Sequence, residues 1–319
     1  MTRELLILRH GKSDWDAGTD DYHRPLKDRG KRGAQRMGVW LQQQHFVPDL
    51  VISSPAERAL VTAQKLCKAM GKGGQGIQRD ERVYAATAED LLEVLTGCPE
   101  SAQRVMLVGH NPGLEDLLVW LVGATVSVPD DGKLLPTATL ARLLVPDAWT
   151  DLSPGCALLE SITRPANLPK KFPFPGPDGT EQRDRPAYYY TQSSVIPYRL
   201  NKGKLEILVI SSSKNKHLVV PKGIKDPGLN PQESAAKEAW EEAGVEGKVA
   251  TDALGEYRYG KWGATCTVTV YPMKVTRVIP DEEWEERHRG REWMPPDKAA
   301  SRLKQKELRP MVKMLENLL

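Results

Sequence analysis

A proline-dense stretch near the middle of the chain limits what it can fold into more than any other feature. Residues 165–186 hold six prolines and show neither helical nor strand periodicity. Such a composition is typical of a semi-rigid spacer. We therefore expect one domain at residues 1–164, a spacer at 165–187 and a second domain at 188–319, each able to bury its own core.

The two parts on either side of this stretch show different patterns. Before it, short apolar runs alternate with helical segments, which indicates an α/β domain with a doubly wound, mostly parallel sheet. After it, alternating strand-like segments surround one strongly signalled helix, and a further helix closes the chain. The second part is therefore expected to be an α+β domain with a mixed sheet.

Three carboxylates share one face of the strongly signalled helix. Glu238, Glu241 and Glu242 stand at positions i, i+3 and i+4, where like charges repel. Mg²⁺ or Mn²⁺ recruits such hard oxygen ligands. Asn230 suits the N-cap and Gly244 the C-terminal end of the helix. The pattern predicts a divalent-cation site.

Residues 223–245 resemble the Nudix box, G-x5-E-x7-R-E-U-x-E-E-x-G-U with U apolar, over its whole length. Leu229 stands where Glu is usual and Lys237 where Arg is usual. We expect that a supporting polar pair has been lost or replaced while the carboxylates remain. The flanking segments look most like the branch that contains diphosphoinositol polyphosphate and dinucleoside polyphosphate hydrolases. This resemblance implies cleavage of phosphoanhydrides, with the three glutamates and the Gly223 carbonyl as ligands of Mg²⁺ or Mn²⁺.

Basic residues near this segment are candidates for binding the substrate's phosphates. We predict this role for Lys222, Arg199 and Lys261. The base that activates water is left open between the carboxylate triplet and a downstream acid such as Glu283 or Glu286.

Two histidines end apolar runs in the first domain. His10 ends the apolar run in MTRELLILRHG, and His110 ends a second apolar run in QRVMLVGHNPG. Ligands bind outside the carboxyl ends of parallel strands, so both histidines could face one pocket. Arg9 and Arg58, the latter in the first turns of a helix, would add an anion cradle.

The segments LRHGKSDW, HRPLKDRGKRGAQRM, SSPAERALVTA, GHNPGLEDL and LPTATLARL resemble, in this order, the histidine phosphatase superfamily. They are most similar to the small phosphohistidine phosphatases of the SixA type. The resemblance implies that His10 is the nucleophile that accepts a phosphoryl group. It also implies that Arg9, Arg58 and His110 bind the phosphoryl oxygens, and that this domain needs no cofactor.

The general acid of larger members of that superfamily is missing from its expected place. Ala85 and Ala86 stand where a Glu would be expected. The SixA-like group lacks this acid too, which suits a phosphoramidate leaving nitrogen. Asp14 and Glu115 are the candidates for a substitute.

Composition limits which binding partners and which cellular location are expected for the protein. The formal net charge of +3 is too small to indicate a nucleic acid polymer as partner. The chain shows neither a secretory apolar region nor a long apolar span, so we expect no membrane contact and a cytoplasmic location. The expected partners are a polyphosphorylated small molecule and, for the first domain, a phosphohistidine protein. Formation of a homo-oligomer is left open.

Two classes of function remain open at this point. The first is a bifunctional enzyme with a metal-dependent phosphoanhydride hydrolase and a histidine phosphatase. The second is a sensor that binds a phosphoanhydride ligand without turnover in one or both domains. The intact glutamate triplet favours the enzyme, while the changes at Leu229 and Lys237 favour the sensor.

Overall fold

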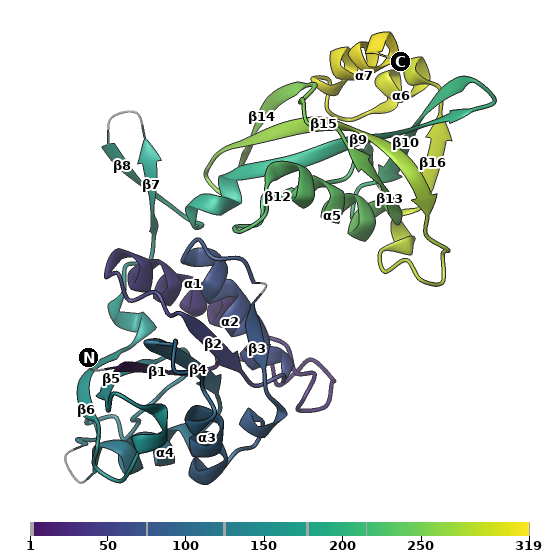
Figure 1. The fold of residues 1–319 in the computed structure, drawn as a ribbon. Helices are drawn as coiled ribbons and strands as arrows, with labels where there is room; N and C mark the ends of the chain where they lie inside the picture. The colour runs from purple at the N-terminus through teal and green to yellow at the C-terminus, as the bar shows by residue number, and fades with distance from the viewer. Residues whose placement is uncertain (1–2, 75, 124–125, 177–178, 215, 319) are drawn as a thin grey trace. The chain divides into compact units, whose positions relative to one another are not determined.

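The computed structural model describes residues 3–74, 76–123, 126–176, 179–214 and 216–318. It separates into two compact units, Met1–Phe172 and Pro173–Leu319, and each is described by itself (Figure 1). The division falls inside the expected spacer.

A six-stranded sheet forms the centre of the N-terminal unit, in the order β3-β2-β4-β1-β5-β6. Strands β3, β2, β4 and β1 run parallel to one another. Strand β5 is antiparallel to β1, and β6 is antiparallel to β5. The strands are β1 (Arg3–Arg9), β2 (Leu50–Ser53), β3 (Ile77–Arg79), β4 (Arg104–Gly109), β5 (Leu140–Val145) and β6 (Leu158–Thr163). This confirms the expected α/β domain with a mostly parallel sheet.

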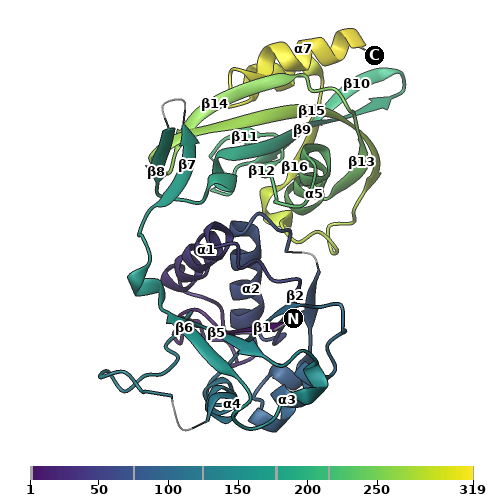
Figure 2. The same ribbon diagram turned by 60° about the vertical axis from the view of Figure 1, so that its left-hand side comes forward.

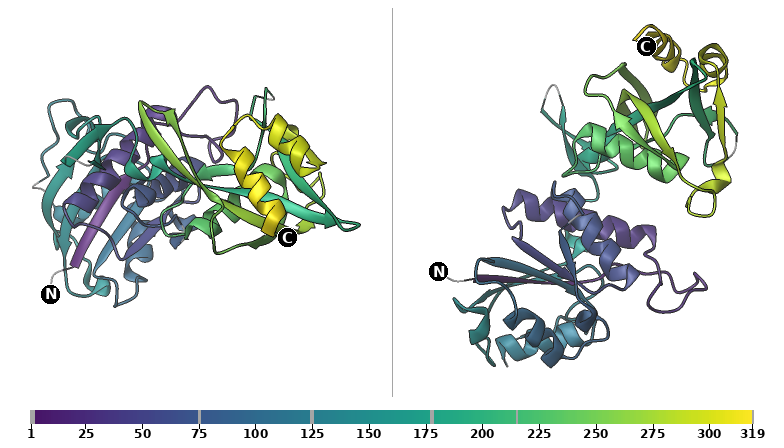
Figure 3. Two further views of the ribbon diagram at one scale, coloured as in Figure 1. Left: turned by 90° about the horizontal axis from the view of Figure 1, so that it is seen from above. Right: turned by 45° about the vertical axis from the view of Figure 1, so that its right-hand side comes forward.

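Helices cover both faces of this sheet. They are α1 (Asp28–Gln43), α2 (Glu57–Ala69), α3 (Ala88–Thr96) and α4 (Gly113–Val122). Figures 2 and 3 show α1 and α2 on one face and α3 and α4 on the other. In β1, Leu6 and Leu8 join the core under α1 and α2, while Leu5 and Ile7 join the opposite core. Because alternate strand residues point to opposite faces, one apolar run fills two cores.

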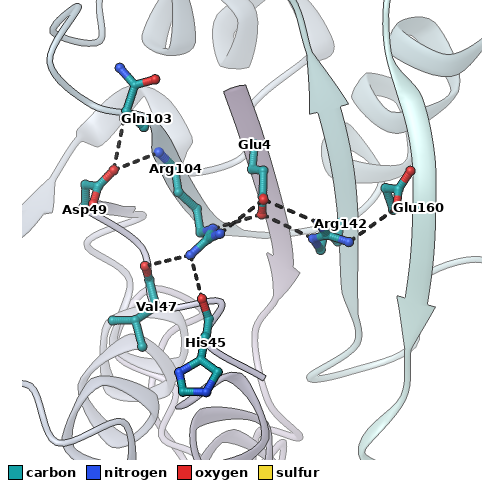
Figure 4. Close-up of polar contacts among 8 residues, drawn as sticks. All are labelled: Glu4, His45, Val47, Asp49, Gln103, Arg104, Arg142 and Glu160. Atoms are coloured by element: carbon teal, nitrogen blue, oxygen red, sulfur yellow. Dashed lines mark hydrogen bonds and ion pairs between the residues drawn. The ribbon is translucent and has the colours of Figure 1, made fainter. Parts of the chain in front are cut away.

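A network of ion pairs closes the edge of the sheet at which β1 begins (Figure 4). The Glu4 carboxylate accepts hydrogen bonds from Arg104 Nε at 2.8 Å and Arg142 Nε at 3.1 Å. Arg142 also pairs with Glu160 at 3.4 Å, and the Asp49 carboxylate accepts the Arg104 N–H at 2.9 Å. These contacts stabilise one end of β1 and leave the other end free for a site.

A mixed sheet of eight strands forms the C-terminal unit, with the main order β11-β10-β9-β15-β13. Strand β12 pairs with β9, β14 with β15 and β16 with β10. Among the strand pairs that the structure describes in this sheet, only β9 and β15 are parallel. The strands are β9 (Thr191–Asn201), β10 (Lys204–Ser211), β11 (Leu218–Val219), β12 (Lys222–Ile224), β13 (Val245–Val249), β14 (Gly255–Lys261), β15 (Ala264–Val278) and β16 (Arg291–Met294). The expected mixed α+β domain is confirmed.

Three helices pack on this second sheet. They are α5 (Pro231–Ala243), α6 (Pro296–Arg302) and α7 (Leu308–Leu318). Ala235 and Ala239 of α5 share a core with Leu208 of β10. Met311 and Val312 of α7 share a different core with Ile207, the residue before Leu208 in the same strand. Helix α5 therefore lies on one face of the sheet and α7 on the other, as Figure 1 also shows.

Part of the proline-rich stretch folds into a β-hairpin. Strands β7 (Phe172–Gly176) and β8 (Gly179–Arg183) form it, and a short 3-10 helix (Ala187–Tyr190) follows. The Arg183 guanidinium lies 3.2 Å from the ring centroid of Phe174 and 4.8 Å from that of Tyr190. The Tyr190 hydroxyl donates to the Trp262 carbonyl at 3.2 Å. Cation–π contacts therefore order a segment for which we expected only a spacer.

Among the helices in the described parts of the chain, none is both long enough and apolar enough to cross a membrane.

Candidate active sites

His10 and His110 meet at the carboxyl edge of the N-terminal sheet. His10 directly follows β1 and His110 directly follows β4, and these strands are parallel neighbours. Both side chains are buried, and their ring centroids are 5.0 Å apart. The structure thus brings together the two histidines that the sequence placed at strand ends.

Both imidazoles are neutral near neutral pH. Burial lowers the pKa of His10 to about 4, and the positive charges of Arg58 and Arg9 contribute. Burial also lowers the pKa of His110 to about 3. The His10 Nδ1 atom lies 2.7 Å from the Gly11 carbonyl oxygen. A carbonyl only accepts, so the neutral ring carries its proton on Nδ1, and the lone pair of Nε2 is available to attack phosphorus.

Three arginines add positive charge around this pair. Arg58 and Arg24 are only 5% and 7% exposed, and Arg9 Nη1 donates to the Leu135 carbonyl at 2.8 Å. Within the described chain, the buried Nε atoms of all three, Arg24 Nη1 and His110 Nδ1 have no hydrogen-bond partner. Buried donors are normally paired, so this donor set fits an anionic ligand.

Asp21 connects two of these arginines. Its carboxylate accepts hydrogen bonds from Arg58 Nη2 at 2.8 Å, Arg24 Nη2 at 2.8 Å and the Tyr84 hydroxyl at 3.0 Å. Partial burial acts to raise the pKa of Asp21, but the Tyr84 hydrogen bond and the Arg58 charge lower it overall. Asp21 is therefore ionised and holds both guanidinium groups. Asp21 and Arg24 were not predicted from the sequence, although Arg24 lies in HRPLKDRGKRGAQRM, one of the resembling segments.

A cavity of about 640 Å³ opens beside His110 and Arg58. Residues 84–89 form one wall, and Asn111, Pro112 and Asp116 also line it. Ala85 and Ala86 are part of this wall, so the position at which a general-acid Glu was expected does border the cavity.

The two substitute acids lie elsewhere. The Asp14 carboxylate pairs with Lys27 Nζ at 3.1 Å, and Glu115 Oε1 accepts the Leu135 N–H at 2.8 Å. Neither side chain lines the cavity beside His110. The structure does not bring either acid to the expected place of proton donation.

The glutamate triplet lies on α5 in the C-terminal unit. A capping box begins this helix, with 2.8 Å hydrogen bonds in both directions between Asn230 and Glu233. Burial raises the pKa of Glu238 to about 8, and the charges of Glu242 and Glu241 add to the shift. The charges of Glu242 and Glu241 thus repel that of Glu238, and a cation would relieve this repulsion.

Gly223 lies directly against this triplet. A Cβ atom at this position would overlap the Glu238 carboxylate. Glycine is therefore required for the close approach of the β12 backbone to the acid. The structure thus places the backbone of Gly223 beside Glu238, and the role of its carbonyl as a ligand stays a prediction.

Glu242 has two partners that the box alone does not reveal. Its Oε2 accepts the Lys222 main-chain N–H at 2.9 Å, and its Oε1 accepts a hydrogen bond from Arg289 Nη2 at 2.6 Å. Arg289 also pairs with Glu286, whereas Glu283 lies 3.8 Å from Arg277. Of the two downstream acids considered as bases, only Glu286 is thus linked to the triplet.

The triplet fits a hard divalent cation by its chemistry. It offers carboxylate oxygens of partly buried side chains, and burial raises the pKa of Glu238 and of Glu242. In the parts of the chain that the structure describes, no three acidic, His or Cys side chains are already arranged as a metal cage. A cation that binds Glu242 would compete with Arg289.

Asp226 contacts both residues at which the segment departs from the Nudix box. Lys237 Nζ donates to Asp226 Oδ2 at 2.8 Å and lies 3.7 Å from Glu241 Oε1. The Leu229 N–H donates to the Asp226 carbonyl at 3.1 Å. Lys237 is thus paired with Asp226, and the expectation that a polar pair of the box has been lost or replaced stays a prediction.

A second cavity, of about 650 Å³, lies beside Glu242. Its lining includes the basic residues Lys214, Lys216, His217, Lys222, Lys261, Arg289 and Lys304. Two of the three predicted substrate-binding residues, Lys222 and Lys261, are thus at the cavity. Arg199 is not part of the lining and pairs with Glu206 at 2.7 Å. The prediction for Arg199 is not supported by its placement.

Comparison with known proteins assigns the two units to different groups. The model of the histidine phosphatase superfamily (branch 1) matches residues 5–84, and that of the NUDIX domain matches residues 190–317. An uncharacterised protein of Mycobacterium tuberculosis is 32% identical over 160 residues, which are 48% of this chain and 96% of that protein. Nudix hydrolase 17, mitochondrial, of Arabidopsis thaliana is 39% identical over 114 residues, or 31% of this chain and 58% of that protein. A solved structure of the protein histidine phosphatase SixA with tungstate is 20% identical, with a TM-score of 0.44, and covers 51% of this chain and 98% of its own.

Proposed function

The N-terminal half of this chain belongs to the histidine phosphatase superfamily and its C-terminal half is a Nudix domain, and from this premise we propose two separate hydrolytic activities. In the N-terminal half, His10 takes a phosphoryl group from a phosphorylated substrate or a phosphohistidine protein and passes it to water. In the C-terminal half, the glutamate triplet supports metal-dependent cleavage of a phosphoanhydride in a polyphosphorylated small molecule. We place both activities in the cytoplasm.

The N-terminal proposal rests on one observation, the free Nε2 of a neutral imidazole among unpaired cationic donors. Arg9, Arg58 and His110 would bind the phosphoryl oxygens and stabilise the charge of the transition state. Asp21 would hold Arg58 in place for this task.

Trapping of the phosphorylated enzyme tests this half. The chain reacts with labelled p-nitrophenyl phosphate, and the reaction is quenched rapidly without acid. We expect one acid-labile labelled phosphoryl group on His10. His10→Ala should lose the label, and His23→Ala, a change at an exposed histidine, should keep it. Label on any other residue would refute the assignment.

The C-terminal proposal rests on the carboxylate of Glu238, whose pKa is raised by burial and by the charges of Glu242 and Glu241. Nudix domains generally use divalent metals such as Mg²⁺, which would polarise the phosphate oxygens and help to activate water. Glu238, Glu241 and Glu242, with the Gly223 carbonyl, would hold the ion. The basic side chains around the neighbouring cavity would bind the substrate's remaining phosphates.

Phosphate release with Mg²⁺ tests this half. The panel consists of an inositol pyrophosphate, a dinucleoside polyphosphate and a nucleoside triphosphate. Glu241→Gln should lower turnover of the preferred substrate by about 10²-fold or more, whereas Glu246→Gln on β13 should have no effect. Tight binding of these compounds without turnover of any of them would instead support the sensor.

A further inference from the structure

The strand register places Gln192 and Lys222 on the same face of the C-terminal sheet. In β12, the backbone of Gly223 approaches Glu238 of α5. Alternate strand residues point to opposite faces, so Lys222 and Ile224 face away from that helix. Gln192 of β9 is the antiparallel partner of Ile224, and directly opposite residues share a face. Gln192 therefore lies beside Lys222 on the face turned away from α5.

Tyr259 reaches the same place from β14. In the parallel pair of β9 and β15, Gln192 is the partner of Val268. Tyr259 is the partner of Cys266, which stands two residues before Val268 in β15. Residues two apart in a strand share a face, so Tyr259 lies on the face of Gln192. Strands β9, β12 and β14 thus bring a glutamine, a lysine and a tyrosine together.

Hydrogen bonds close a triangle among these three side chains. The Lys222 ammonium donates to Gln192 Oε1 and to the Tyr259 hydroxyl, both at 2.9 Å. The Tyr259 hydroxyl donates to the same Gln192 oxygen at 2.8 Å. Gln192 Nε2 donates to the Tyr189 carbonyl at 3.5 Å, which sets the orientation of the amide. Both acceptors of the ammonium are neutral, so they hold its nitrogen and leave its charge uncompensated.

The ammonium of Lys222 keeps one donor for another partner. An ammonium group has three N–H donors, and the triangle uses two of them. Within the described chain, Glu242 accepts the main-chain N–H of Lys222 and not its ammonium. A partly buried charge without a counterion is costly unless an anion joins it. The third N–H is therefore available to an anionic ligand.

The cavity beside Glu242 is where such a ligand would meet this donor. Lys222 and Tyr259 both line that cavity. Gln192 does not line it and is only 2% exposed. A ligand in the cavity would thus contact Lys222 but not Gln192, so any effect of Gln192 on the ligand has to pass through the residues that it holds.

We propose that Gln192 is a positioning residue for the C-terminal site: it holds the Lys222 ammonium by a neutral oxygen, so that a charged N–H is presented to a phosphate of the substrate. This inference rests on the proposed phosphoanhydride hydrolysis. It deepens that proposal by adding a residue that the substrate does not touch. Lys222 would bind a phosphate that does not react, equally before and during the reaction, so a misplaced ammonium should raise KM and leave kcat unchanged.

Kinetics of Gln192 variants test this role. Phosphate release with Mg²⁺ is measured in the full chain carrying His10→Ala, with the member of the substrate panel that is turned over fastest. Gln192→Met keeps the length of the side chain and removes the acceptor, and KM should rise about tenfold. Gln192→Glu keeps the acceptor but adds a charge that neutralises Lys222, so KM should rise at least as much. In both variants kcat should change less than about twofold.

A double-variant cycle shows whether Gln192 acts through Lys222. Lys222→Met alone should raise KM, and Gln192→Met added to it should change KM by less than about twofold. Tyr259→Phe removes the second acceptor and should raise KM only while Lys222 is present. Tyr271→Phe is the matched control, because this buried tyrosine of β15 belongs to the core under α5, and it should leave KM and kcat unchanged.

The outcomes separate this inference from the proposed function. Multiplying effects of Gln192→Met and Lys222→Met on KM would overturn the inference, and so would an unchanged KM in Gln192→Glu. If Gln192→Met lowers the unfolding temperature, Tyr259→Phe decides: an equal rise in KM with and without Lys222 would overturn the inference. Absence of Mg²⁺-dependent turnover that Glu241→Gln removes would overturn the proposed function, and the inference together with it.

Discussion

At the scale of single residues, burial decides the chemistry of the histidine pair. An exposed imidazole would be partly protonated near neutral pH, with a pKa of about 6.5. Burial lowers the pKa of His10 to about 4, so that the nucleophile is ready well below neutrality. Because His10 is neutral near neutral pH, the positive charge of the site comes from the surrounding arginines.

The first prediction concerns pH. His10-dependent labelling by p-nitrophenyl phosphate should stay flat on acidification until it falls by half near pH 4. Because the folded-state pKa is lowered, the unfolded chain binds more protons between pH 6.5 and 4, so stability should fall as the pH drops through this window. Urea unfolding across this window measures the slope, and His10→Ala should reduce it. A half-loss of labelling near pH 6.5 would contradict the account.

The second prediction concerns the ion pair of Asp226 and Lys237 in the segment that resembles the Nudix box. Asp226 holds Lys237 at 2.8 Å, and Lys237 is only 3.7 Å from Glu241. In Asp226→Ala the ammonium group should turn to Glu241 and compete with the cation. The Mg²⁺ concentration that gives half-maximal phosphate release should rise about tenfold, which corresponds to about 1.4 kcal/mol. An unchanged Mg²⁺ dependence, with Asp252→Ala as the exposed control, would show that the pair has no such role.

At the scale of elements, local signals predicted the helix that carries the glutamates. Asn230 was expected at its N-cap, and it begins α5 with a capping box. The apolar run of β1 contributes to two cores, which is typical of a parallel strand covered on both faces. The β7–β8 hairpin could not be predicted in this way, because its proline residues mask strand periodicity and contacts with Arg183 and Tyr190 hold it.

The third prediction tests what holds this hairpin. Arg183 lies over two aromatic rings and its side chain is 15% exposed. Arg183→Ala should lower the free energy of unfolding of the C-terminal unit by about 1 kcal/mol. Arg277→Ala, at a side chain that is 58% exposed, should change it much less. Equal effects in urea unfolding followed by tryptophan fluorescence would mean that the cation–π contacts do not stabilise the unit.

At the scale of the whole molecule, the sequence identified residues that come directly after strands or share one helix. His10 and His110 were found because their strands are parallel neighbours, and the glutamates because they share α5. Arg24, Asp21 and Arg289 were missed, because they reach their sites from loops or a short 3-10 turn, and no periodicity predicts where such segments fold back. Nothing in the pattern around Arg199 showed that Glu206 would hold it away from the cavity.

The central claim is that one chain carries two independent phosphate-hydrolysing sites. The most direct test measures phosphate release by the full chain, His10→Ala and Glu241→Gln, from N-phosphoimidazole in EDTA and from the preferred phosphoanhydride with Mg²⁺. We predict that His10→Ala abolishes only the release in EDTA and that Glu241→Gln abolishes only the Mg²⁺-dependent release. Loss of both activities in either variant, with the fold retained, would contradict the claim.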